Sequence, residues 1–185
     1  MQQASHAVTP GTASAGMVAA LAANLSARWT IRHRVDADMA FLSTLYASTR
    51  EDEMRIVPWP PEVKQAFLQD QFNKQHTHYL SGYPDALWLI LEQAGEPAGR
   101  IYVEQTNSEI RLMEISLLPA HRNAGLGTSL MSALLDFADL QGLPVTLHVE
   151  PYNPAKRLYQ RCGFLDVETH GYYVLMQRMP HGKAS

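Results

Sequence analysis

The sequence has few charged residues and a single cysteine. Only 18% of its 185 residues are charged and the formal net charge is −3, whereas nucleic-acid binding needs a basic surface, so we expect no nucleic-acid partner. The lone Cys162 excludes an internal disulfide and suits the reducing cytoplasm. No apolar run is long enough to span a bilayer, so we expect no membrane partner either.

The beginning of the chain lacks charge altogether. No Asp, Glu, Lys or Arg precedes Arg28, so the short apolar stretch Met17–Leu25 lacks the basic flank of a signal peptide. Enrichment in Ala, Ser, Thr and Gly predicts a disordered or loosely helical extension over residues 1–26. Residues 27–180 are then expected to form one domain. Whether this domain forms a homodimer stays open at this point.

Hydrophobic periodicity predicts an α/β fold in which strands and helices follow in the order β α α β β β α β α β β. Strands are expected over Trp29–Arg34, Leu87–Glu92, Arg100–Gln105, Glu109–Leu118, Val145–Val149, Phe164–Thr169 and Tyr172–Arg178. Helices are expected from Met39 to Tyr46, Glu62 to about His78, Ala124 to Leu140 and Pro154 to Arg161. The pattern indicates a mixed, mostly antiparallel sheet of about six or seven strands with about four helices. The third helix crosses between the fourth and fifth strands, which should therefore be parallel neighbours.

A glycine-containing loop, Arg122–Thr128, lies where the fourth strand gives way to the third helix. Such a junction offers unpaired backbone N–H groups and the positive end of a helix dipole. Gly125 and Gly127 would let the backbone approach an anion closely, which suits a diphosphate. Taken alone, the pattern is also compatible with an ordinary glycine-rich loop.

A second motif runs from Asn153 to Phe164. Asn153 before a proline is good helix-capping chemistry, and Gly163 is a typical residue just after a helix. Capping alone therefore explains both residues. It does not explain why this motif follows the glycine loop with one strand in between.

The two motifs together resemble those of GNAT acetyltransferases. The matching residues are Arg122-x-x-Gly125-x-Gly127 and Asn153-Pro154-Ala155-x-x-Leu158-Tyr159-x-x-x-Gly163-Phe164. The resemblance covers about residues 29–178 and includes the expected strand order. It implies a GNAT-like fold with acetyl-CoA as acyl donor, held where the fourth and fifth strands splay apart, and no metal.

The resemblance also implies roles for individual residues. The backbone of Ile115, Ser116 and Leu117 would pair with the pantetheine arm, and a bulge there would free an N–H for the thioester oxygen. The diphosphate would bind the loop of Arg122, Asn123, Ala124, Gly125, Leu126, Gly127 and Thr128. Asn153 would lie near pantetheine, and Tyr159 would contact the cofactor near its sulfur and protonate the leaving thiolate.

The general base is assigned less directly. Glu114 lies in an apolar run of the fourth strand, where a carboxylate needs a partner or a task. Strand alternation places it opposite to Met113 and Ile115, as a base facing the cleft or as the partner of an arginine such as Arg100 or Arg111. His148 and Glu150, on one face of the fifth strand, are the other candidates. His76 and His78 lack a third ligand of suitable spacing for a metal, and Trp59 is a candidate for lining the acceptor pocket.

The sequence thus predicts an enzyme that transfers an acetyl group from acetyl-CoA to a primary amine by direct attack within a ternary complex. The acceptor is a small molecule or a peptide whose identity the sequence does not specify. One alternative is an acyl-CoA-binding regulatory module without catalysis, which the presence of Tyr159 argues against. Another is a transferase that acts on charged tRNA, which the acidic balance disfavours.

Overall fold

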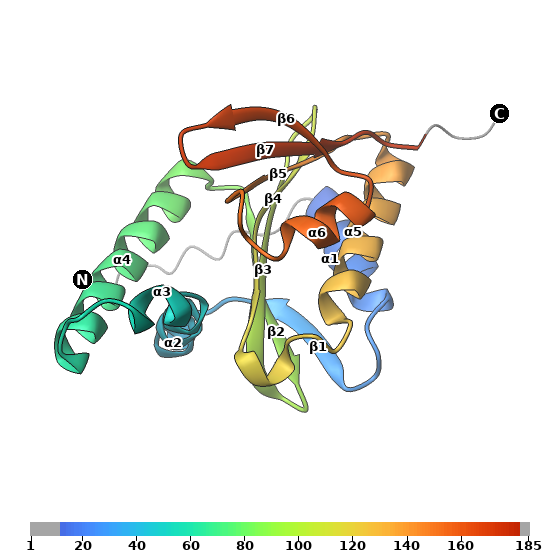
Figure 1. The fold of residues 1–185 in the computed structure, drawn as a ribbon. Coiled ribbons are helices and arrows are strands. Elements are labelled where there is room, and N and C mark those ends of the chain that lie inside the picture. Colours follow the sequence, from blue (N-terminus) through green and yellow to red (C-terminus); the bar gives the residue numbers. More distant parts are fainter. Residues whose placement is uncertain (1–11, 182–185) are drawn as a thin grey trace, which may run out of the picture.

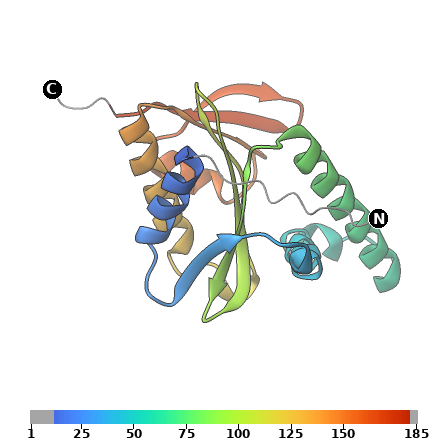
Figure 2. The same cartoon turned by 180° about the vertical axis from the view of Figure 1, so that it is seen from behind.

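The computed structural model describes residues 12–181, which form a central sheet with helices on both faces (Figures 1 and 2). The strands are β1 (Trp29–His33), β2 (Leu87–Gln93), β3 (Glu96–Gln105), β4 (Ile110–Leu117), β5 (Val145–Val149), β6 (Leu165–His170) and β7 (Tyr173–Arg178). The helices are α1 (Thr12–Ala23), α2 (Met39–Thr49), α3 (Glu51–Arg55), α4 (Pro61–Gly82), α5 (Leu126–Gln141) and α6 (Lys156–Arg161), with short 3-10 turns at Asp36–Asp38 and Pro119–His121.

The sheet has seven strands in the order β1-β2-β3-β4-β5-β7-β6. Only β4 and β5 are parallel neighbours, and every other pair is antiparallel. The expected mixed, mostly antiparallel α/β fold is therefore confirmed, with α5 as the crossover between β4 and β5. In Figure 1 the long strands β2 and β3 run steeply, whereas β6 and β7 cross above them, so the sheet turns sharply near β4 and β5.

Two hydrophobic cores lie on opposite faces of the sheet. The larger core packs α1 and α5 against inward-facing residues such as Ile101, Val103 and Leu147. The smaller core packs α2 and α4 against the other face, where Tyr102 and Ile90 are buried. Alternate residues of β3 therefore serve different cores, as the period of a strand requires.

Helix α1 corrects the expectation of a loose N-terminal extension. Within its two central turns Met17 and Leu21 are fully buried against the larger core, and Gly16 lies close to the Phe137 ring of α5. The residues around Met17 and Leu21 are small, so the hydrophobic pattern of the helix is too weak to be recognised in the sequence. The same small residues allow α1 to approach α5 closely. Residues 1–11 lie outside the described part of the chain. Among residues 12–181, no helix combines the length and apolar character of a membrane span.

The burial of Leu21 makes α1 part of the folded domain, so Leu21→Ala should lower the free energy of unfolding by about 2–5 kcal/mol. The neighbouring Ala22 is exposed on the same helix, and Ala22→Ser should change the free energy of unfolding by less than about 1 kcal/mol. Urea denaturation of both variants measures the difference. Equal midpoints for the two would show that α1 does not contribute its side chains to the core.

Candidate active site

The two parallel strands of the sheet separate after three residue pairs. Ile110 to Leu112 of β4 pair with Val145 to Leu147 of β5, and the pairing stops there although both strands continue. Within the described chain, the β5-facing edge of β4 from Met113 to Leu117 has no strand partner. Apart from the Leu117 carbonyl oxygen, which accepts a hydrogen bond from the Arg122 side chain, the peptide groups of this edge are available to an extended ligand that enters the wedge between the strands, much as an added strand would.

A bulge interrupts β4, but earlier than the resemblance implies. Tyr102 pairs with Glu114 and the next residue, Val103, pairs with Leu112, so Met113 is the additional residue. The bulge lies at Met113 and not within Ile115–Leu117, so that expected position is wrong. Because a bulge reverses the strand's alternation, Met113 packs with Tyr102 in the smaller core, on the same side as Glu114. The expectation that Met113 points away from Glu114 is likewise wrong.

The loop before α5 presents an uninterrupted run of free backbone donors. Among the described residues, no hydrogen-bond partner is found for any backbone N–H of residues 123–128, and the first helical bond runs from Ser129 to Gly125. Asn123 and Gly125 both have left-handed backbones, with φ of 60° and 82°. Alternating backbone conformations of this kind turn successive N–H groups towards one concavity, which suits an anion.

The Arg122 side chain is exposed and lies across the surface towards the end of β4 and α2. Its Nε donates to the Leu117 carbonyl oxygen at 2.8 Å, and its Nη2 donates to the carbonyl and hydroxyl oxygens of Ser48 on α2, at 3.2 and 3.1 Å. In this structure Arg122 therefore ties the end of β4 to α2. The groups of this loop that are left to meet an anion are therefore its backbone N–H donors, and Thr128 lies beside them in the first turn of α5.

The second motif forms the turn from β5 into α6. The side-chain oxygen of Asn153 accepts a hydrogen bond from the Ala155 N–H at 2.9 Å and so orders the turn before α6. Asn153 is not the expected cap, because α6 begins only at Lys156 and its N-cap is Ala155. Tyr159 follows on α6, where its ring lies beside Phe164 and its side chain is only 7% exposed. Its hydroxyl has no hydrogen-bond partner among the described residues. Burial, with a smaller contribution from Glu114 and Cys162, raises the pKa of Tyr159 above its ordinary value, so the phenol stays protonated at neutral pH.

Glu114 lies on the α4 side of the sheet and is 21% exposed. Its Oε2 is 3.5 Å from Nη2 of Arg100, which is buried in β3, so the expected alternative of an arginine partner is realised with Arg100. The same carboxylate contributes to raising the pKa of two phenols, Tyr159 of α6 and, after burial, Tyr79 of α4. The charge of Glu114 thus acts on phenols from both helices.

The other two candidates for a base have different surroundings. His148 is exposed on β5, one residue beyond the last pair with β4, and partial loss of hydration at its ring together with the charge of Arg111 lowers its pKa. Glu150 follows the end of β5 and forms an ion pair of 3.4 Å with Arg50 at the α2–α3 junction. Glu150 therefore helps to hold α2 beside the wedge, opposite the contact between Arg122 and Ser48.

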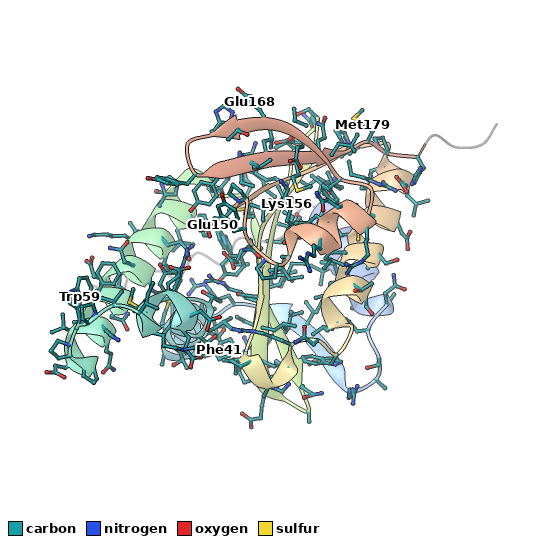
Figure 3. The ribbon with its side chains drawn as sticks, viewed as in Figure 1. Phe41, Trp59, Glu150, Lys156, Glu168 and Met179 are labelled. Carbon is teal, nitrogen blue, oxygen red and sulfur yellow. The ribbon has the colours of Figure 1, made fainter. Side chains whose placement is uncertain are left out.

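Two surface cavities lie near these elements. One, of about 520 Å³, follows the turn after β5 and is lined by Pro151, Tyr152, Asn153, Pro154, Lys156, Arg157 and Gln160. The other, of about 620 Å³, lies between α2, α3 and α4. Trp59 packs edge-on against Phe67 near the outer end of α4, far from Glu150 in Figure 3, so it does not line a pocket at the wedge. Trp59 is not among the residues that line either cavity, and its suggested place in the acceptor pocket stays a prediction.

Comparison with known proteins decides the family. The model of the acetyltransferase (GNAT) family matches residues 44–164, which is more than half of the chain. The chain belongs to the GNAT acetyltransferase family. No curated protein matches this family member significantly.

Solved structures share the GNAT fold at low sequence identity. The PaiA N-acetyltransferase of Thermoplasma acidophilum, in complex with coenzyme A, has a TM-score of 0.62 and 19% identity, covering 84% of this chain and 99% of its own. An acetyltransferase of Thermus thermophilus has a TM-score of 0.59 and 22% identity, with coverages of 82% and 96%. YncA of Salmonella typhimurium, with its cofactor acetyl-CoA, has a TM-score of 0.51 and 21% identity, with coverages of 85% and 97%. These likenesses establish the fold.

Sequence reasoning missed the residues that act across long separations. The contact of Arg122 with Ser48 and that of Arg50 with Glu150 join α2 to the β4 and β5 ends, and no local pattern marks either pair. Arg100 was only one of two possible partners for Glu114. A buried position for Arg100 could have been suspected, because it stands next to the apolar residues of β3.

Proposed function

We propose that this GNAT family member is an N-acetyltransferase that transfers the acetyl group of acetyl-CoA to a primary amine, by direct attack within a ternary complex. The observation that carries the proposal is the unpaired β4 edge leading directly to the free N–H groups of residues 123–128. The pantetheine arm of acetyl-CoA fits the unpaired β4 edge, and the diphosphate at its end fits the free N–H groups of the loop. Two of the similar structures, PaiA and YncA, were solved with coenzyme A or acetyl-CoA.

The donor-binding groups proposed here follow the wedge. Backbone groups of Ile115, Ser116 and Leu117 would pair with the pantetheine arm, and the residues after β5, including Asn153, would contact it from the other side. The loop from Arg122 to Thr128 would hold the diphosphate through its backbone. A backbone N–H of β4 near the bulge would stabilise the thioester oxygen as it becomes negative.

The proton transfers are assigned to Tyr159 and Glu114. Acetyl-CoA supplies the activated acyl group, and the amine nitrogen forms a bond to its carbonyl carbon as the carbon–sulfur bond breaks. Tyr159, kept protonated by its raised pKa, would give its proton to the departing thiolate. Glu114 would accept the proton that the amine loses, directly or through one water. The products are an N-acetylated amine and coenzyme A.

A panel of amines tests the function most directly. Polyamines, amino acids, peptides with free N-termini and aminoglycosides are each incubated with acetyl-CoA, and the release of free thiol is followed. Turnover of any amine, with the acetyl group found on nitrogen by mass spectrometry, supports the proposal. Binding of acetyl-CoA without turnover of any member would instead favour a regulatory module that binds acyl-CoA.

The pH dependence tests the assignment of the base. A base must be deprotonated to act, so kcat/KM should fall on the acidic side as its carboxylate becomes protonated. Glu114→Gln should lower kcat/KM by about 10²-fold and flatten this acidic limb. The same profile is recorded for the alternatives, His148→Gln on β5 and Glu150→Gln just after it.

Stability must be measured beside activity, because Glu114 is the carboxylate that pairs with Arg100 and its loss leaves a buried charge uncompensated. A flattened limb in a variant that still unfolds cooperatively supports Glu114. If Glu114→Gln keeps the acidic limb while His148→Gln or Glu150→Gln loses it, the base is the residue whose variant loses the limb.

A further inference from the structure

A fully charged side chain lies inside the smaller core. Arg100 is only 2% exposed, and its guanidinium stands over the ring of Tyr102, with 5.0 Å between the guanidinium carbon and the ring centroid. Its Nε donates to the hydroxyl of Ser116 at 3.2 Å, and its Nη2 donates to the side-chain oxygen of Gln75 at 3.2 Å. The guanidinium therefore joins β3, β4 and α4 at one point.

The proposed chemistry gives this arginine no role of its own. A buried guanidinium is costly unless a countercharge lies nearby, and apolar residues of similar volume often stabilise a core equally well. Its countercharge is Glu114 at 3.5 Å. Burial alone would lower the pKa of Arg100, but Glu114 and Tyr102 more than offset this, so Arg100 remains charged.

Arg100 contacts only one of the two carboxylate oxygens of Glu114. Nη2 of Arg100 is close to one carboxylate oxygen, Oε2, while no hydrogen bond to Oε1 from another described residue is found. Arg100 approaches from the buried side, and Glu114 keeps about a fifth of its surface exposed. One oxygen is thus held by the core, and the other remains available.

We propose that Arg100 is a positioning residue for Glu114, holding one carboxylate oxygen so that the other oxygen is left for the acceptor amine. The inference rests on the proposed role of Glu114 as base. Gln75 extends the contact to α4, so the position of the carboxylate is also linked to the helix that carries Tyr79. Arg100 touches no reacting atom and acts only through Glu114.

Several titratable and charged groups surround this pair. They are Tyr79 and His76 on α4, Tyr102 on β3, Tyr159 on α6 and Arg34 after β1. His76 is the one that could imitate the expected effect, because burial and the charges of Arg34 and Arg100 lower its pKa, and removing Arg100 would let it rise. The tyrosines titrate far above the acidic range.

The test replaces Arg100 with methionine and follows Glu114 in two ways. Without the guanidinium, the acidic limb of kcat/KM should move to higher pH by about 1 unit or more, the scale of a carboxylate losing a neighbouring arginine. Carbon-13 NMR of protein labelled in glutamate should show the same upward movement of the Glu114 titration midpoint, with the resonance assigned by its loss in Glu114→Gln. The NMR measurement needs no substrate, so it tests this inference even if no amine is turned over.

Matched variants separate positioning from a structural effect. Arg100→Lys keeps the positive charge, so the acidic limb and the Glu114 titration midpoint should lie close to those of wild type. Gln75→Leu removes only the link to α4 and should leave the Glu114 titration midpoint unchanged. The double variant Arg100→Met/His76→Gln should retain the shift. In a Glu114→Gln background, Arg100→Met should cause little further loss of kcat/KM.

The inference is overturned if the Glu114 resonance titrates at the same pH in wild type and Arg100→Met, or if the shift disappears in the His76 double variant. Normal turnover of an amine by Glu114→Gln would instead refute the role of Glu114 as base. The NMR titration would then report only whether Arg100 acts on the Glu114 carboxylate.

Discussion

Replacing Tyr159 with phenylalanine is expected to lower kcat by about 10²-fold or more while leaving acetyl-CoA affinity within a few-fold. The hydroxyl is the only group removed, and it lies on α6 beside the wedge, without a protein hydrogen-bond partner among the described residues. Because the ring packs beside Phe164, Tyr159→Phe should fold normally. Steady-state kinetics with an identified amine, combined with calorimetric titration of acetyl-CoA, measures both quantities.

Tyr79→Phe is the matched control for this prediction. Tyr79 is also a largely buried phenol whose pKa is raised by burial and then by Glu114, but it belongs to α4. If proximity to Glu114 were enough, both variants would lose activity equally. We expect kcat of Tyr79→Phe to stay within a few-fold of wild type. A large loss there with full activity in Tyr159→Phe would transfer the role of proton donor to Tyr79.

The direction of the pKa shift adds a pH prediction. A proton donor must be protonated, and the raised pKa of Tyr159 keeps the phenol intact throughout the neutral and mildly alkaline range. Any alkaline limb of kcat below about pH 10 should therefore arise from another group. Such a limb should persist in the residual activity of Tyr159→Phe.

Local patterns were sufficient for most of the fold. Helix α5 has large apolar residues at helical spacing and ends at Gly142, whose φ of 67° suits glycine, so both its face and its end could be read from the sequence. The parallel pairing of β4 and β5 followed from the crossover formed by this helix. Helix α1 was missed because Met17 and Leu21 are its only fully buried large residues, and alanines fill most of the remaining positions.

The site was predicted less completely because its contacts join distant residues. The additional residue at Met113 changes the alternation of β4, and nothing in the run from Leu112 to Ile115 distinguishes a bulge from a regular strand. Arg122 meets Ser48 only because the chain folds α2 against the end of β4. The positions of Gly125 and Tyr159, in contrast, could be predicted from the sequence, because a positive φ and a helical spacing are local properties.

Gly125→Val is expected to weaken binding of coenzyme A by about 10-fold or more, which corresponds to the loss of at least one charge-assisted hydrogen bond. Gly125 lies in the middle of the donor-rich segment 123–128 and directly precedes α5. A branched side chain there would stand between the diphosphate and its backbone donors. Isothermal titration of coenzyme A measures the loss.

Backbone strain must be separated from this effect, because φ at Gly125 is 82°, where valine costs about 1–2 kcal/mol even though its Cβ would meet no neighbouring atom. Gly142 provides the control: it ends the same helix, has φ of 67° and is equally open. Gly142→Val should therefore destabilise the fold similarly and leave affinity unchanged. Equal loss of affinity in Gly125→Val and Gly142→Val would mean that strain in α5, and not obstruction of the loop, controls binding.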